Sequence, residues 1–199
     1  NGLAPGARTI GDGPGPRVGA GAARTAQSGQ TILRCPFMAI LKTTLLVIVL
    51  LALAVGLAAQ LGLLRGRTPS DLGARDGRLK PPSTTPNSVS SQAALYPDNP
   101  QRAYAAIAPF SASEGGPQTL ERIRRICEGM PGAKVAKSDP GYLHVQFETR
   151  WMKFVDDTEF WFDPRAGLIH VRSASRMGRK DFGVNRARVE AIRARLEAR

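Results

Sequence analysis

The pattern of apolar and polar positions divides the chain into one long uncharged stretch and a series of shorter, periodic segments. Residues 43–64 are 22 consecutive positions without a charge, and 13 of them are Leu, Ile or Val. A helix of this length spans ~33 Å, and the hydrocarbon core of a bilayer is ~30 Å thick. Lys42 bounds the stretch on one side, and Arg65 and Arg67 bound it on the other. The pattern predicts one transmembrane helix, because a buried core helix of this length normally keeps a polar face.

Residues 38–64 also have the layout of a secretory signal, with a charged start followed by an apolar run. Small residues fall inside the run at Ala52, Ala54, Ala58 and Ala59. The run exceeds the ~7–15 apolar residues of a usual signal peptide, which favours an uncleaved signal anchor in the inner (cell) membrane. The alternative is a protein secreted after cleavage. Arg65 and Arg67 favour a cytoplasmic C-terminal side, but long domains translocate largely regardless of charge, so we expect an exported domain.

The segment before the anchor has a different composition. Residues 1–37 contain no methionine, and 12 of the first 36 residues are Gly or Pro. No apolar periodicity runs through them, which predicts disorder. The first methionine, Met38, stands where a signal segment should begin. We therefore expect Met38 to be the native start, with residues 1–37 upstream of it.

Glycine, arginine and proline dominate the chain after the anchor. Residues 65–78 are typical of a juxtamembrane linker. Prolines then predict an extended or turning path over the surface through residues 79–91, because proline excludes helix. Asn99 and Pro100 suit the start of a short helix ending near Ala106.

A clearer helix follows Pro117. Its apolar stripe has helical spacing and consists of Leu120, Ile123, Ile126, Cys127 and Met130. Gly129 and the Pro131-Gly132 pair predict its end. Cys127 lies on the stripe and is therefore expected to be a buried core thiol.

The period then changes to two, which predicts strands over residues 134–138, 142–148, 155–162 and 168–175. Turn residues separate them, so neighbouring strands should pair antiparallel. A last helix is expected from about Gly183 to Arg199. The candidate core residues are Phe147, Phe160, Phe162, Val171, Ile192 and Leu196. We expect residues 79–199 to form an α+β domain, with a small antiparallel four-stranded sheet and helices packed on one face.

Charge and composition exclude several classes of function. The chain carries 28 basic and 16 acidic side chains, yet residues 68–171 carry 12 of each, so the excess lies at the two ends. The basic C-terminal stretch holds one aromatic residue, Phe182, and no nucleic-acid motif, so we expect no nucleic-acid partner. Two cysteines leave neither a disulfide scaffold nor a CxxC site. Walker, Rossmann, HExxH and GxSxG motifs are missing from the sequence, so no cofactor and no metal are expected.

One face of the predicted sheet brings two histidines and two carboxylates close together. These candidates are His144, Asp157, Glu159 and His170. Such a set could ligate zinc or serve as an acid–base pair. The favoured interpretation is a solvated face with cross-strand ion pairs, such as Arg172 with Asp157 or Glu159.

A candidate anion-binding site lies where the last strand leads into the last helix. Helix starts and arginine side chains both favour phosphate or carboxylate. The candidate residues are Arg172, Ser173, Ser175, Arg176, Asn185 and Arg186. In the competing interpretation, Asp181 caps the helix and the arginines pair with strand carboxylates.

Three stretches also carry a family resemblance. They are residues 85–92 (TPNSVSSQ), 154–160 (FVDDTEF) and 170–193, which opens with HVRSASR and closes with RVEAIR. Over about residues 79–196 the chain resembles the bacterial and plant family known as domain-of-unknown-function 1499. The resemblance implies attachment to membranes or export but no reaction. Many members carry cysteines where this chain has Pro82 and Ser88, which implies that the two cysteines act as a pair in those relatives.

These observations lead to two expectations about function. The first is a membrane-anchored, non-catalytic module that binds a ligand or partner: an anionic small molecule, a lipid headgroup or another membrane protein. The second is an enzyme at the membrane surface, either a metal-assisted or a serine-type hydrolase, whose partners need not be close in sequence.

Overall fold

The computed structural model describes residues 36–198 and begins with a long apolar helix, α1 (Pro36–Gln60). Among the residues described, α1 is the one helix long and apolar enough to cross a membrane, and a signal sequence would have the same character. Its first turn includes Pro36 and Phe37, just before Met38. Of the residues 1–37 that were expected to be disordered and upstream of the native start, Pro36 and Phe37 lie in α1, and residues 1–35 lie outside the described residues.

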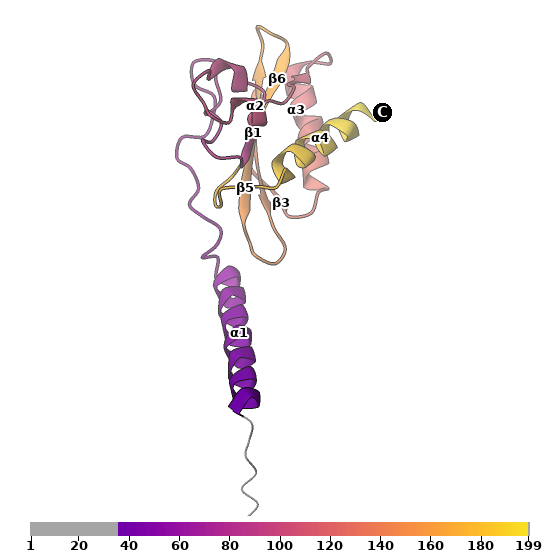
Figure 1. The fold of residues 1–199 in the computed structure, drawn as a ribbon. Coiled ribbons are helices and arrows are strands. Elements are labelled where there is room, and N and C mark those ends of the chain that lie inside the picture. Colours follow the sequence, from indigo (N-terminus) through magenta and orange to yellow (C-terminus); the bar gives the residue numbers. More distant parts are fainter. Residues whose placement is uncertain (1–35, 199) are drawn as a thin grey trace, which may run out of the picture. The chain divides into compact units, whose positions relative to one another are not determined.

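The domain after α1 is built on an antiparallel sheet (Figure 1). Its main path runs in the order β1-β6-β5-β4-β3, and β2 also pairs with β6. The four strands expected from the alternating pattern are all present. They are β3 (Ala133–Asp139), β4 (Tyr142–Glu148), β5 (Val155–Asp163) and β6 (Leu168–Ser175).

The sheet is wider than the four strands expected. Two short strands, β1 (Ser88–Ser90) and β2 (Phe110–Ser111), extend it beside β6. Strands of three and two residues are too short to produce a recognisable alternation, which is why the sequence pattern missed them. The α+β class is therefore correct, with six strands in place of four.

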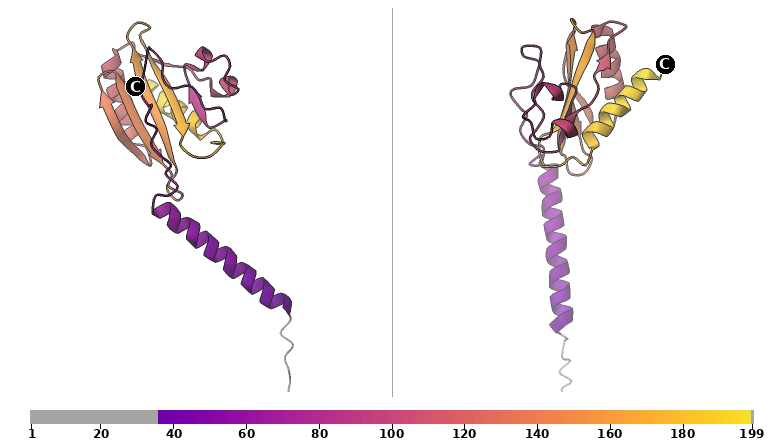
Figure 2. Two further views of the ribbon diagram at one scale, coloured as in Figure 1. Left: turned by 90° about the vertical axis from the view of Figure 1, so that its left-hand side faces the viewer. Right: turned by 45° about the horizontal axis from the view of Figure 1, so that its top comes forward.

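Two helices cover one face of the sheet, α3 (Gly116–Glu128) and α4 (Val184–Glu197) (Figure 2). The core between them and the sheet includes Phe160, Val171 and Ile192, all fully buried, and also Phe147. The remaining expected core residues, Phe162 and Leu196, are partly buried and pack against it. Shorter turns, η1 (Ala93–Leu95) and α2 (Arg102–Ala105), lie between β1 and β2.

Residues 67–85, here called the covering segment, lie against the other face of the sheet. Leu79 is buried, and its backbone N–H donates to Gln92 Oε1 at 2.7 Å. The Gln92 amide in turn donates to the Gly77 carbonyl at 2.9 Å. The expected surface path is therefore corrected at Leu79, which is buried, while the assignment of residues 65–78 as a linker stays a prediction. The glycines and prolines of the covering segment exclude helix, but they do not prevent close packing of an extended chain on a sheet.

Candidate functional site

The covering segment encloses a row of charged side chains on β4, β5 and β6. The strand register places His144 opposite Glu159, and Glu159 opposite Arg172. All three are buried, and so is Asp157. Their exposed fractions are 7% for His144, 0% for Glu159, 4% for Arg172 and 1% for Asp157. This face was expected to be solvated. The structure corrects that expectation, because the covering segment shields the face from water.

Glu159 is the most deeply buried carboxylate of this row. Its Oε1 accepts hydrogen bonds from the Tyr142 hydroxyl at 2.7 Å and from the Gly73 backbone N–H at 2.6 Å. Its Oε2 accepts no hydrogen bond and lies 3.6 Å from Arg172 Nη1. The expected cross-strand ion pair between Arg172 and Glu159 is confirmed.

Asp157 binds two partners at once. Its Oδ1 lies 2.7 Å from His144 Nε2 and accepts a hydrogen bond from Arg176 Nη2 at 2.8 Å, and its Oδ2 accepts one from Arg176 Nε at 2.7 Å. Burial would raise the pKa of Asp157, but the hydrogen bonds from Arg176 and His144 outweigh burial and lower it. Asp157 is therefore held as a carboxylate.

Arg172 is a buried guanidinium with few hydrogen bonds. Its Nε donates to the Pro81 carbonyl at 3.2 Å, and within residues 36–198 neither terminal nitrogen forms a hydrogen bond. Burial lowers the pKa of Arg172, and the nearby carboxylate of Glu159 opposes that shift. Burying a cation in this way is unfavourable unless counter-charges or ligands surround it.

A cavity of about 350 Å³ opens beside Arg172, between β6 and the covering segment. Four basic residues and one acidic residue line it. They are Arg67, Lys80, Arg172, Arg176 and Asp157. Lys80 also pairs with Asp71 at 2.7 Å. The cavity is thus an electropositive hollow with Ser83 and Thr84 on its wall.

Of the other anion-site candidates, Ser175 also lines this cavity, whereas Ser173, Asn185 and Arg186 do not. Ser173 donates to Asn185 Oδ1 at 2.5 Å, and the Asn185 amide donates to Ser175 Oγ at 3.1 Å. Arg186 points elsewhere and donates to the Tyr104 carbonyl at 2.5 Å. The structure therefore divides the set. Arg172, Arg176 and Ser175 line the cavity, and Ser173, Asn185 and Arg186 lie beside or on α4.

Asp181 occupies the start of α4. Its carboxylate accepts hydrogen bonds from the backbone N–H groups of Gly183 at 3.0 Å and Asn185 at 3.1 Å, and from the Tyr104 hydroxyl at 2.5 Å. Burial would raise the pKa of Asp181, but these hydrogen bonds, led by that of Tyr104, lower it. The start of α4 is thus already occupied by a negative charge of the protein itself, the Asp181 carboxylate.

The two histidines do not come together. His170 stacks on Trp161 with ring centroids 5.6 Å apart and lies 3.1 Å from Ser91 Oγ, whereas His144 pairs with Asp157. Burial lowers the pKa of His170. Over the described part of the chain, no three His, Cys, Asp or Glu side chains gather as metal ligands.

Sequence reasoning missed Arg67, Gly73, Lys80 and Tyr142 as parts of this polar region. Tyr142 was within reach, since it alternates with His144 on the same strand face. The others lie in the covering segment, where irregular backbone gives no periodic signal.

Comparison with known proteins places the chain in a family. The family model described as Protein of unknown function (DUF1499) matches residues 78–196, so the chain belongs to this family. The search of curated proteins and the search of solved structures gave no match. The two positions at which the resemblance implies paired cysteines in relatives are neighbours here, because the backbone N–H of Ser83, next to Pro82, donates to Ser88 Oγ at 2.8 Å.

Proposed function

We propose that this protein is a non-catalytic binding module, held in the inner (cell) membrane by α1 as an uncleaved signal anchor, with its domain exported. Its ligand is an anion, bound in the cavity between β6 and the covering segment. The uncharged stretch of residues 43–64, most of which lies in α1, and its basic flanks support the anchor. The basic lining of the cavity supports the choice of ligand.

The observation that carries the proposal is the Arg172 guanidinium, whose side chain is 5% exposed and lines the cavity. Its terminal nitrogens form no hydrogen bond with residues 36–198, so they can donate to a ligand oxygen. A guanidinium presents its donors in a planar fork that matches phosphate or carboxylate geometry. Glu159 Oε2 lies 3.6 Å from Arg172 Nη1 and supplies a counter-charge to the guanidinium.

Arg67 supplies a positive charge that no buried carboxylate balances. It is exposed at the mouth of the cavity, and no acidic side chain within the described residues pairs with it. Arg176 and Lys80 are already paired with Asp157 and Asp71. An anion would therefore be attracted by Arg67 and then held by Arg172.

The experiment is a titration of the full-length chain, in nonionic detergent, with inorganic phosphate, pyrophosphate and glycerol 3-phosphate. We expect at least one anion to raise the melting temperature and Arg67→Gln to weaken its binding about fivefold. Arg165→Gln is the matched control, because Arg165 is exposed in the β5–β6 turn and lies outside the cavity. An absence of any shift, or equal weakening by the control, would contradict the proposal.

The second candidate is an enzyme acting at the membrane surface, and the buried His144–Asp157 pair favours it. His144 also lines a separate cavity of about 480 Å³ with Tyr142, Lys137 and Trp161. A histidine paired with a carboxylate is a common general base. A screen of ester and phosphoester substrates, comparing the parent with His144→Gln, tests this candidate. Turnover that is lost in the variant while its melting temperature is kept would replace the binding-module proposal.

A further inference from the structure

Two loops at one end of the domain concentrate its exposed apolar side chains. They join β4 to β5 (residues 149–154) and β6 to α4 (residues 176–183), and are here called the aromatic loops. Among residues 65–198, six large apolar side chains are exposed, and five lie in these loops or directly after them. The five are Trp151, Phe154, Met177, Phe182 and Val184, with Trp151 at 73% and Phe182 at 91% exposure. A cluster of this kind on a soluble surface marks an interaction site.

The same loops are strongly basic. They contain five basic residues and one acidic residue, Asp181, which is buried against the start of α4. Arg150, Arg179 and Lys180 are exposed, and none of them pairs with an acidic side chain in the part of the chain described. The Arg150 guanidinium lies 5.2 Å from the centre of the Trp151 ring. Aromatic rings beside unpaired cations are the combination that settles at the headgroup level of a bilayer.

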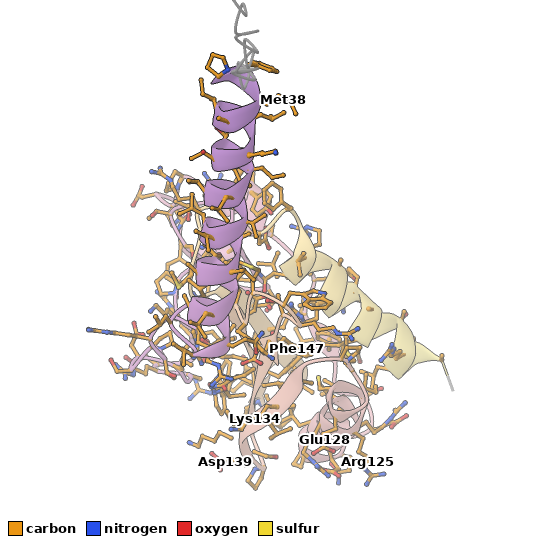
Figure 3. All side chains as sticks on the ribbon, turned by 90° about the horizontal axis from the view of Figure 1, so that it is seen from below. Met38, Arg125, Glu128, Lys134, Asp139 and Phe147 are labelled. Atoms are coloured by element: carbon orange, nitrogen blue, oxygen red, sulfur yellow. The ribbon has the colours of Figure 1, made fainter. Side chains whose placement is uncertain are left out.

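The two loops form one surface. Asp156 pairs with Ser175 in the sheet, and the backbone N–H of Arg176 donates to the Val155 carbonyl at 3.1 Å, so both loops leave the sheet side by side. An apolar groove of about 690 Å³ connects them, lined by Thr149 and Arg150 from one side and Val184 from the other. Phe147 forms part of its floor, and Figure 3 shows this side chain next to α4.

The chain that leaves α1 runs directly past these loops. Arg65 Nε binds Glu148 Oε2 at 2.8 Å, at the end of β4. A Cβ atom on Gly66 would lie 2.9 Å from side-chain atoms of Arg176 and Met177, so the backbone at Gly66 touches the second loop. Only four residues separate Gln60, the last residue of α1, from Arg65. Five residue steps extend at most ~18 Å, so the aromatic loops lie within that reach of the end of the apolar helix.

We propose that the aromatic loops dock on the bilayer in which α1 is anchored, with Trp151 and Phe182 among the headgroups and Arg150, Arg179 and Lys180 facing anionic lipid. This inference rests on the proposed membrane anchor. The short connection between α1 and the loops favours lipid over a protein partner, since it holds an aromatic and basic surface within a short distance of a bilayer. Docking fixes the orientation of the domain on the membrane.

The test uses the full-length chain in vesicles of phosphatidylcholine and phosphatidylglycerol (7:3), with bromine at acyl carbons 6 and 7 of the phosphatidylcholine. Trp161→Phe leaves Trp151 as the tryptophan that reports on the loops. Trp151→Phe leaves Trp161, which stacks on His170 within the sheet, as the control. We expect bromine to quench Trp151 at least twofold more strongly than Trp161. Equal quenching of the two tryptophans, or no quenching of Trp151, would overturn docking on the bilayer. Either result is the one expected if the loops bind a protein partner instead of lipid.

A charge comparison sharpens the test. Arg179→Gln with Lys180→Gln should weaken the quenching of Trp151, because each cation near anionic lipid contributes about fivefold to partitioning. Lys134→Gln with Arg165→Gln removes the same charge from exposed positions outside the loops and should leave quenching unchanged. Equal effects of the two pairs would overturn the role of the loop cations.

Alkaline carbonate extraction of the same vesicles separates the two proposals. Retention of the chain with Trp151 unquenched overturns docking and leaves the anchor standing. Release of the chain by carbonate overturns the anchor, and with it this orientation. Retention with selective quenching of Trp151 supports both.

Discussion

The guanidinium of Arg176 donates two parallel hydrogen bonds to the carboxylate of Asp157, from Nε to Oδ2 at 2.7 Å and from Nη2 to Oδ1 at 2.8 Å. Both side chains are almost fully enclosed, at 6% and 2% exposure. This bidentate pair connects the residue after β6 to Asp157, the third residue of β5. It therefore fixes the point at which the chain leaves the sheet toward α4.

Removing Arg176 should destabilise the domain strongly. In Arg176→Ala, Asp157 keeps His144 as its remaining side-chain partner, and breaking a buried ion pair costs ~3–5 kcal/mol. The free energy of unfolding can be measured by urea titration of the full-length chain in nonionic detergent, followed by tryptophan fluorescence. Arg179→Ala, an exposed change in the same loop, should stay within ~0.5 kcal/mol of the parent. Similar losses in the two variants would contradict the importance of the pair.

The Asp157 network should also produce an acid-dependent loss of stability. The pKa of Asp157 is lowered below its usual 3.8 in the folded chain. The stabilising contribution of the Asp157 carboxylate is therefore complete when the pH is above the usual pKa of 3.8. It declines as the pH falls from there through the lower pKa of the folded chain. The difference in unfolding free energy between the parent and Asp157→Asn should be constant from pH 7 to about 5 and shrink below about pH 4. Asp181 titrates in both proteins, so the difference isolates Asp157. A difference that stays constant down to pH 2.5 would be inconsistent with the lowered pKa.

Much of this architecture is encoded in short-range patterns. The alternation through β4, β5 and β6 predicted each strand, and it also placed Arg172 on the same face as Glu159. The covering segment has no such pattern, because its packing depends on single contacts such as that of Gly73 with Glu159. Burial of the polar face therefore could not be read from residues 67–85.

The expected anion site failed to assemble as one set for a reason visible in the sequence. Consecutive residues of a strand point to opposite faces, so Arg172 and Ser173 could not share a site. The separation of His144 from His170 depended on strand order and register, which local sequence does not specify.

Cys127 should behave as an inert core thiol. Burial raises the pKa of the Cys127 thiol to about 12, so almost no thiolate exists at neutral pH. In a Cys35→Ser background, we expect maleimide to label Cys127 at pH 7.5 only after unfolding in urea. Rapid labelling of the folded chain, measured by mass spectrometry, would show that the thiol is accessible.

Phe160 should carry a large share of the core stability. Its side chain is fully buried and meets Phe110 edge to face, with ring centroids 5.7 Å apart. Phe160→Ala should cost ~3–5 kcal/mol, because the truncation leaves a cavity behind the central strand. Phe182→Ala is the comparison, since Phe182 is exposed, and it should change the unfolding free energy by less than ~0.5 kcal/mol. An unchanged unfolding midpoint in Phe160→Ala would be incompatible with this packing.

The hydrogen bond from Tyr142 to Glu159 should be measurable as a coupling energy. Burial raises the pKa of Tyr142, and the neighbouring charge of Glu159 adds to the effect, so the hydroxyl stays protonated and donates at all accessible pH values. Tyr142→Phe should cost ~1–3 kcal/mol, because the buried carboxylate would keep Gly73 as its remaining hydrogen-bond donor.

A double-mutant cycle with Glu159→Gln isolates that bond from the other effects of each substitution. Residues that share a buried hydrogen bond typically couple by ~0.5–3 kcal/mol. The matched cycle pairs Glu159→Gln with Tyr104→Phe, whose hydroxyl bonds to Asp181 instead. That second pair shares no partner and should be additive within ~0.5 kcal/mol. If both cycles were additive, Tyr142 would not hold the Glu159 carboxylate, and Gly73 and Arg172 would be left to position it.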